Sequence, residues 1–300
     1  MSGESLAYSE IIVIPGARLR EIPGEPFYDF PLHVDTDKEW MPLGENGKPQ
    51  EIVGGDSRLA AAAEYYRTHE QLSEYHPLFL AIGNYETLPT PDGSFRRVSR
   101  PTAMRDKLVG FYGLPKTFAE AYHSEPSTYG NADAFFEWAE ESSGKMTGIR
   151  EVKVLTNEFH ITRTFVMFAH ALYARTHDGA NLADVMSDTI KRSIESILAE
   201  TLVDDSTGDT SELAAVRDLC KPFLEDAPLR IVPLVVEDIL TTSGDSELMA
   251  WADRIRNDRL VHETRKHERH GISAYLRGEY ELDHPIPHSS SASSSSESVQ

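Results

Sequence analysis

The chain has 300 residues, of which 40% are hydrophobic and 26% charged, enough apolar side chains for one large domain or a domain with an extension. Its formal net charge of −20 argues against nucleic acids and anionic membrane surfaces as partners, because both are bound mainly through clustered Lys and Arg. The single cysteine excludes an intrachain disulfide and a zinc site built from several cysteines.

Short apolar runs alternate with helical patterns over the first half of the chain. The apolar runs predict strands at 10–18, 76–84 and 152–156, and a weak one within 117–126. Apolar spacing and capping residues predict helices at 54–72, 101–115, 127–142 and from about 157 onward. Residues 20–53 and 85–100, rich in Pro, Gly and polar groups, are predicted as long loops. Such alternation predicts a doubly wound, three-layer α/β/α sandwich around a mainly parallel sheet.

The second half of the chain is predicted to be mostly helical. Helices are expected at 181–202, 211–224 and 246–278, and a strand leading into a helix at 229–240, where Pro233 interrupts the pattern. We expect residues 1–178 to form the α/β domain and residues 179–285 to form a helical extension that could pack on it. The Ser-rich tail, 286–300, cannot bury a core and is predicted to be disordered.

Neither targeting nor membrane insertion is indicated. The first residues lack a basic start followed by an apolar segment, so they do not resemble a signal peptide. No apolar run reaches the roughly 18 residues that a membrane-spanning helix needs. We therefore expect a soluble, cytoplasmic protein with no membrane partner.

The loops that follow the strands of a doubly wound sheet meet at its carboxyl edge, where helix N-termini offer N–H groups to ligands. The residues predicted to gather there are Gly16, Arg18, Gly83, Asn84, Thr128, Thr156, Asn157, His160 and Arg163. His160 and Arg163 would share a face at the start of one helix. Arg163, with Arg18 and Arg58, could bind the oxygens of an anionic ligand, while His160 is placed for proton transfer.

A purely structural interpretation of the same residues stays open. In it, His160 caps the turn by bonding to backbone and Arg163 pairs with a carboxylate such as Glu158. A metal site in "VHETRKHERH" is not favoured, because His262 and His267 lie roughly 140° apart around a helix. The chain also lacks the Gly-x-Ser-x-Gly pattern of ordinary serine hydrolases.

The stretch "LTNEFHITRTFVMF" (155–168) resembles a signature of the YdcF/SanA/ElyC-like family, in which Tyr or Phe is followed by His and, three positions later, by Arg. Five further pieces occur in the family's order between residues 11 and 170: "IIVIPGA", "SRLAAAAEYY", "LFLAIGN", "GLP" and "TYGNA". The resemblance implies a Rossmann-like domain with conserved polar residues at the carboxyl edge of its sheet. It carries over to Gly16, Arg58, Gly83, Thr128, Asn131, His160 and Arg163. The ligand that it implies is nucleotide-like or adenosyl-like, such as S-adenosylmethionine.

Three departures from the family's pattern leave the activity open. The glutamate expected before the Gly-Val-Pro helix is absent from "SRPTAM" (99–104), and Ser-Gly-Gly becomes Ile-Gly-Asn at 82–84. Tyr122 and Glu125 stand where the family has Glu and Ser. We therefore expect either a hydrolase or transferase acting at a phosphoryl or adenosyl centre, or a non-catalytic ligand-binding or scaffold protein. The helical second half, outside the match, leaves a homo-oligomer open.

Overall fold

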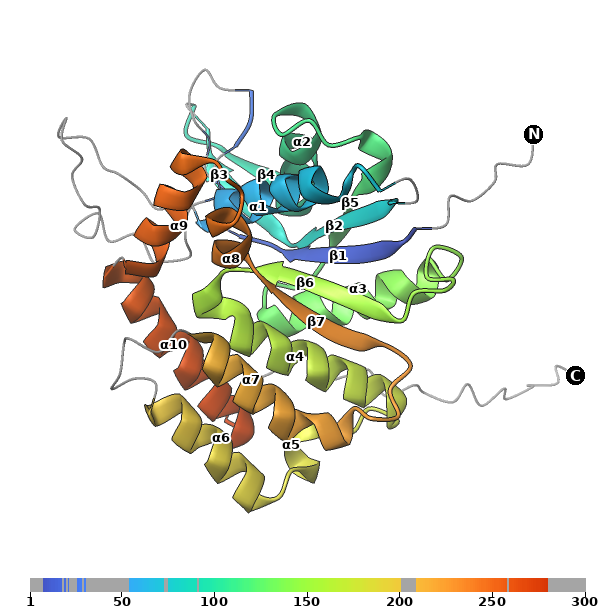
Figure 1. Cartoon of the computed structure of the whole chain (residues 1–300), viewed down its shortest axis with the longest axis vertical. Helices are drawn as coiled ribbons and strands as arrows, with labels where there is room; N and C mark the ends of the chain where they lie inside the picture. The colour runs from blue at the N-terminus through green and yellow to red at the C-terminus, as the bar shows by residue number, and fades with distance from the viewer. Residues whose placement is uncertain are drawn as a thin grey trace, which may run out of the picture.

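The computed structural model describes residues 8–17, 19, 21, 26–28, 30, 54–72, 75–90, 92–200, 209–257 and 259–279. Its centre is a five-stranded sheet in the order β5-β2-β1-β6-β7, and all four neighbouring pairs are parallel. The strands are β1 (Glu10–Pro15), β2 (Pro77–Gly83), β5 (Ala119–His123), β6 (Glu151–Thr156) and β7 (Arg230–Val235). Helices cover both faces of this sheet, so the predicted three-layer α/β/α fold is confirmed (Figure 1).

Strand β1 shows why the central strands read as unbroken apolar runs. Ile11 and Val13 pack into the core on one face of the sheet, and Ile12 and Ile14 pack into the core on the other. All four side chains are fully buried. A strand covered on both faces needs apolar residues at every position, because neither set of side chains meets water.

The helices form two groups, one on each face of the sheet. One face is covered by α1 (Gly54–His69), α2 (Arg100–Gly110) and α8 (Val236–Thr241), and the other by α3 (Thr128–Glu141) and α4 (Glu158–Thr176). From β1 the chain first forms β2 on one side of β1, and it later returns to form β6 on the other side of β1. The carboxyl ends of β1 and β6 therefore form the switch point, where doubly wound sheets bind their ligands.

The second half of the chain completes this sheet and its core. Its elements are α5 (Leu182–Val185), α6 (Asp188–Glu200), α7 (Asp209–Cys220), β7, α8, α9 (Ser246–Asn257) and α10 (Arg259–Leu276). Strand β7 pairs with β6 from Glu151↔Arg230 to Thr156↔Val235. It forms despite Pro233 because it lies at the edge of the sheet, where one side of the backbone needs no strand partner. Helix α10 runs beside α4 and α7 (Figure 1).

Two expectations about local structure are wrong. Residues 85–100 form an antiparallel hairpin, β3 (Tyr85–Pro89) and β4 (Phe95–Ser99), instead of a loop. The turn residues at its tip predicted irregular structure, but the flanking segments pair from Tyr85↔Ser99 to Pro89↔Phe95. The helix expected at 181–202 is two helices, because the side chain of Ser187 caps a new start by accepting from Ile190 N at 3.3 Å.

Other boundaries differ in simpler ways or cannot be compared. The helix expected at 246–278 is divided into α9 and α10. Most of the predicted loop at 20–53, and all of the tail at 286–300, lie outside the described residues. Within the part of the chain that the structure describes, no helix combines the length and apolar character required to cross a membrane.

Candidate functional site

Two glycines bring the carboxyl ends of β1 and β2 into close contact. A Cβ atom on Gly16 would lie 2.9 Å from the carbonyl oxygen of Ile82 and 3.1 Å from Cα of Gly83. A Cβ on Gly83 would in turn lie 3.3 Å from Cα of Gly16. The predicted neighbours Gly16 and Gly83 therefore touch, and no larger residue fits at Gly16 without a shift of backbone.

Arg58 of α1 links the end of β1 to the start of α4. Its Nε donates to Asn157 Oδ1 at 2.9 Å, and its Nη1 donates to the carbonyl oxygens of Pro15 and Gly16 at 2.9 and 3.3 Å. Burial lowers the pKa of Arg58 to about 10, although Glu237 and Glu268 act in the opposite direction. The guanidinium stays charged at neutral pH, and it ties Gly16 and Asn157 together across the switch point.

A carboxylate of the protein lies at the N-terminus of α4. Asn157 donates from Nδ2 to Ser57 Oγ at 2.8 Å and to Glu237 Oε1 at 3.0 Å. The other oxygen of Glu237 accepts from the backbone N–H of Glu158 at 2.8 Å. Burial raises the pKa of the Glu237 carboxyl above its usual value, although these hydrogen bonds act in the opposite direction. The N–H that a ligand was expected to use is thus bound by a side chain from α8.

His160 and Arg163 lie on one face of α4 and meet the same carboxylate of α10. His160 Nδ1 is 2.7 Å from Glu268 Oε2, and Arg163 Nη1 donates to that oxygen at 3.4 Å. Helix α10 comes close here because it carries glycine: a Cβ on Gly271 would lie 3.1 Å from Cζ of Arg163. The His160, Arg163 and Glu268 side chains keep 14, 20 and 14% of their surface exposed.

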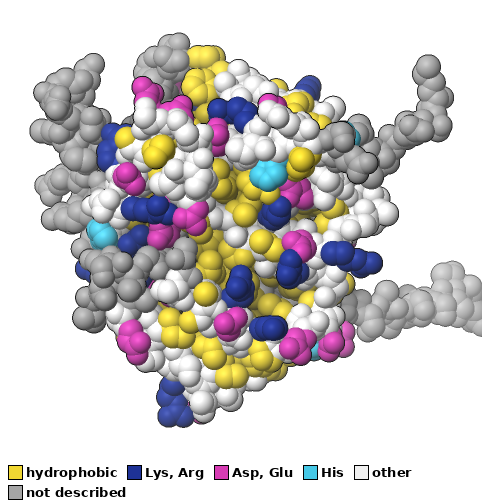
Figure 2. All heavy atoms as spheres, in the orientation of Figure 1, with side chains coloured by type: hydrophobic (Ala, Val, Ile, Leu, Met, Phe, Trp, Pro, Cys, Tyr) yellow, Lys and Arg dark blue, Asp and Glu magenta, His cyan; other side chains and the backbone are white. Residues whose placement is uncertain are grey.

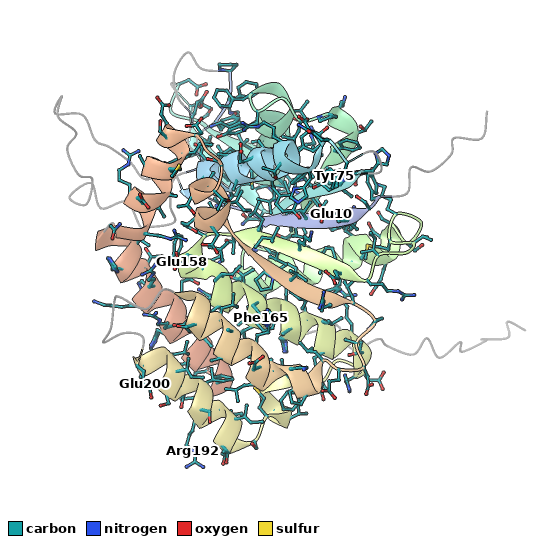
Figure 3. The ribbon with its side chains drawn as sticks, in the orientation of Figure 1. Glu10, Tyr75, Glu158, Phe165, Arg192 and Glu200 are labelled. Atoms are coloured by element: carbon teal, nitrogen blue, oxygen red, sulfur yellow. The ribbon has the colours of Figure 1, made fainter. Side chains whose placement is uncertain are left out.

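Glu158 is the carboxylate that the structural interpretation offers as a partner for Arg163, and the carboxylate that the structure shows on Arg163 is Glu268. Glu158 lies at the start of α4, beside α9 and α10, whereas Phe165 lies farther along the same helix (Figure 3). Its Oε2 accepts from Arg256 Nε at 2.8 Å, and its Oε1 is 3.9 Å from Arg265 Nη2. Around α9 and the start of α10, acidic side chains lie next to basic ones on the molecular surface (Figure 2).

The charge state of Glu268 determines what its contact with His160 can do. Burial alone would raise the pKa of Glu268, but His160 and Arg163 outweigh burial and lower it to about 2. An ionised carboxylate can only accept, so Nδ1 of His160 carries the proton in this contact. The contact orients the imidazole ring, as a carboxylate does for a catalytic histidine.

The remaining predicted residues belong to the β2, β5 and α3 side of the same edge. Asn131 accepts from Ser124 Oγ at 2.7 Å, and the backbone N–H of Ser124 donates to the carbonyl oxygen of Gly83 at 2.9 Å. Thr128 is the buried first residue of α3. Asn84 accepts through its backbone carbonyl from Arg100 N at 3.1 Å.

Thr156 and Arg18 complete the predicted set. Thr156 ends β6 and is fully buried, and its hydroxyl has no hydrogen-bond partner within the described part of the chain. Arg18 lies outside the described residues. The structure thus brings together Gly16, Gly83, Arg58 and Asn157. His160 and Arg163 instead contact α10, and Asn131 contacts Ser124.

Sequence reasoning missed two carboxylates that shape this edge. Glu237 is the second residue after β7 and lies in the first turn of α8, so the strand-to-helix pattern at 229–240 contained a usable signal. Glu268 lies within a long charged helix, and nothing local distinguishes it from its neighbours. Only the packing of α10 on α4 identifies it.

Other known proteins add no constraint on the function. No protein-family model, curated protein or solved structure matches the chain. The resemblance to the YdcF/SanA/ElyC-like family therefore stays a prediction. Among the side chains that the structure describes, no three His, Cys, Asp or Glu residues are grouped so that they could hold a metal ion.

Proposed function

We propose that the chain is a cytoplasmic α/β protein that binds a small ligand, either anionic or nucleotide-like or adenosyl-like, at the carboxyl edge of its sheet. The observation that carries this proposal is the contact of His160 and Arg163 with one ionised carboxylate, Glu268, at the start of α4. Arg163 supplies positive charge for ligand oxygens, and His160 supplies a proton donor or acceptor whose ring is oriented by Glu268. The His160 side chain keeps 14% of its surface exposed.

Gly16 and Gly83 lie at the carboxyl edge of the sheet, where doubly wound sheets bind their ligands. Their missing side chains let the ends of β1 and β2 pack against each other. The reaction, if the protein is an enzyme, is hydrolysis or group transfer at a phosphoryl or adenosyl centre, with His160 as the acid–base. S-adenosylmethionine and nucleotides are the ligands to test first.

A thermal-shift screen of nucleotides, adenosyl compounds and phospho-sugars tests this function on wild type, His160→Ala and His177→Ala. His177 is a matched control, because it is an exposed histidine at the other end of α4. A ligand present at 100 times its Kd adds about 2.7 kcal/mol to the free energy of unfolding, a rise in Tm of about 5 °C or more. We expect that rise in wild type and His177→Ala, and a much smaller one in His160→Ala.

Other results would contradict parts of this proposal. A ligand that stabilises wild type and His160→Ala equally supports binding but shows that His160 does not contact it. If no compound in the screen stabilises wild type, the proposed ligand class is wrong.

A non-catalytic scaffold is the second candidate, and one observation favours it. Carboxylates from the second half, Glu237 and Glu268, lie at both positions where an anionic ligand was expected. If those carboxylates are only structural, His160→Ala and Glu268→Ala should each lower Tm without changing the response to any compound in the screen.

A further inference from the structure

The carboxylate of Glu268 makes the contacts that a bound oxyanion would make. One oxygen lies 2.7 Å from the His160 imidazole and within 3.4 Å of the Arg163 guanidinium. Phosphate and carboxylate groups are recognised by this combination of donors. The carboxylate that contacts His160 and Arg163 belongs to a residue 108 positions away from His160 in the sequence.

Charged contacts hold the middle of α10 against α4 and α7. Glu268 and Arg269 both point into this interface, and Arg269 Nε donates to Glu212 Oε2 of α7 at 2.8 Å. Both partners of that second pair are less than 10% exposed. Because desolvation offsets much of the attraction within buried ion pairs, such contacts fix geometry more than they add stability.

The C-terminal turns of α10 are attached differently. Ile272, Tyr275 and Leu276 are buried in the main core. The Tyr275 hydroxyl lies 2.9 Å from His170 Nδ1 and donates to Asn181 Oδ1 at 3.2 Å. This end anchors α10, while the carboxylate of Glu268, about two turns before Tyr275, is held by His160 and Arg163. A change at Glu268 can therefore occur while α10 stays attached to the core.

We infer that His160 and Arg163 form an oxyanion-binding position which α10 fills with its own carboxylate, so that a phosphate or carboxylate group of the ligand must displace Glu268. This inference rests on the proposed function and adds how access to the site is controlled. While Glu268 occupies the position, the apparent affinity for an external oxyanion is reduced by the fraction of molecules in which it is displaced. Removing the carboxylate should therefore strengthen binding, although it removes a group from the site.

Inorganic phosphate is the probe, and its Kd is measured by isothermal titration calorimetry on the full chain. We expect Glu268→Ala, and the isosteric Glu268→Gln, to bind phosphate roughly ten-fold or more tightly than wild type. Glu212→Gln is the matched control, because it removes a buried carboxylate from the same interface without vacating the His160–Arg163 position. Its Kd should equal that of wild type. Adding Arg163→Ala to Glu268→Ala should abolish the gain.

Hydrogen–deuterium exchange of wild type gives a second measurement if a variant fails to fold. Saturating phosphate should increase exchange in residues 262–270 of α10 and leave the anchored end, from Ile272 to Leu276, unchanged. Equal phosphate affinity in wild type and Glu268→Ala overturns the inference, and so does a gain that survives Arg163→Ala. Loss of binding in Glu268→Ala also overturns it.

The proposed function is judged separately from this result. If a compound in the thermal-shift screen stabilises wild type but Glu268→Ala shows no gain for phosphate, binding stands and displacement of Glu268 does not. If neither protein binds phosphate or any screened compound, both proposals fail.

Discussion

Polar side chains buried at the carboxyl edge of the sheet are paired across long stretches of sequence. Arg58 and Asn157 are separated by 99 positions, and Asn157 and Glu237 by 80. Each of these side chains forms hydrogen bonds with polar groups that would otherwise be buried without partners. A buried polar group left without a hydrogen bond costs about 1–3 kcal/mol in the free energy of unfolding. The identity of these residues is therefore coupled, and a single substitution affects several hydrogen bonds.

The buried side chain of His170 predicts that the free energy of unfolding depends on pH. It is fully buried in α4, and its Nδ1 accepts from Leu182 N at 3.3 Å and lies 2.9 Å from the Tyr275 hydroxyl. Burial lowers its pKa from 6.5 to about 4. Between these values the unfolded chain binds the proton and the folded chain does not, so the free energy of unfolding falls as pH drops through this window, by roughly 3 kcal/mol in total.

Urea unfolding of wild type and His170→Asn at about pH 7 and about pH 4.5 measures this effect. The variant lacks the titrating group, so its stability should fall less between the two pH values than that of wild type. The same loss in both proteins would show that His170 does not titrate in this window.

For each of these side-chain interactions, the sequence indicated one partner but not the other. Gly16, Asn157, His160 and Arg163 could be placed at the carboxyl edge because each follows or begins an element with a clear local pattern. Their partners Glu237 and Glu268 could not be assigned in the same way, because which helix packs on α4 depends on tertiary contacts. The periodicity of α10 would be the same if it packed elsewhere.

Elements with continuous apolar runs or strong helical spacing were predicted well, and short exposed ones were not. The central strands are buried on both faces, so their composition alone identifies them. The hairpin β3–β4 is largely exposed, and its pairing depends on cross-strand contacts that a single strand does not reveal. The break between α5 and α6 depends on one capping serine within an otherwise continuous amphipathic pattern.

The close contact between β1 and β2 predicts how a methyl group added at Gly16 would change the free energy of unfolding. Gly16→Ala would place a Cβ 2.9 Å from the carbonyl oxygen of Ile82, which is backbone in a buried strand and cannot move aside cheaply. We expect a loss of about 1–3 kcal/mol in the free energy of unfolding by urea. Gly144→Ala is the control, since a Cβ there meets nothing within 4 Å. Equal stability of the two variants would contradict this account of the β1–β2 contact.

The molecule as a whole is held together by a core that both halves of the chain share. One cluster of buried side chains extends from Ile11 of β1 to Leu276 of α10. The second half also contributes the edge strand β7 and the carboxylates Glu237 and Glu268. A boundary near residue 178 therefore crosses a continuous core.

A truncated chain, 1–178, should consequently fail to form a stable native state. It would expose one side of β6 and leave Asn157, His160 and Arg163 without the carboxylates that contact them. We expect weak near-UV circular dichroism and no cooperative urea transition, whereas a chain ending at residue 280 retains every described element and should unfold cooperatively. A sharp transition for 1–178 would show instead that the first half folds as an independent domain.

The long separation between His160 and Glu268 also has a consequence for the ribosome-bound chain. At a synthesis rate of about 5–20 residues per second, the 108 positions between them take roughly 5–20 s to translate. Throughout that interval His160 and Arg163 lack the carboxylate that contacts them in the folded chain. The oxyanion position therefore forms only late in synthesis, when β7 and α10 complete the sheet and the core around α4.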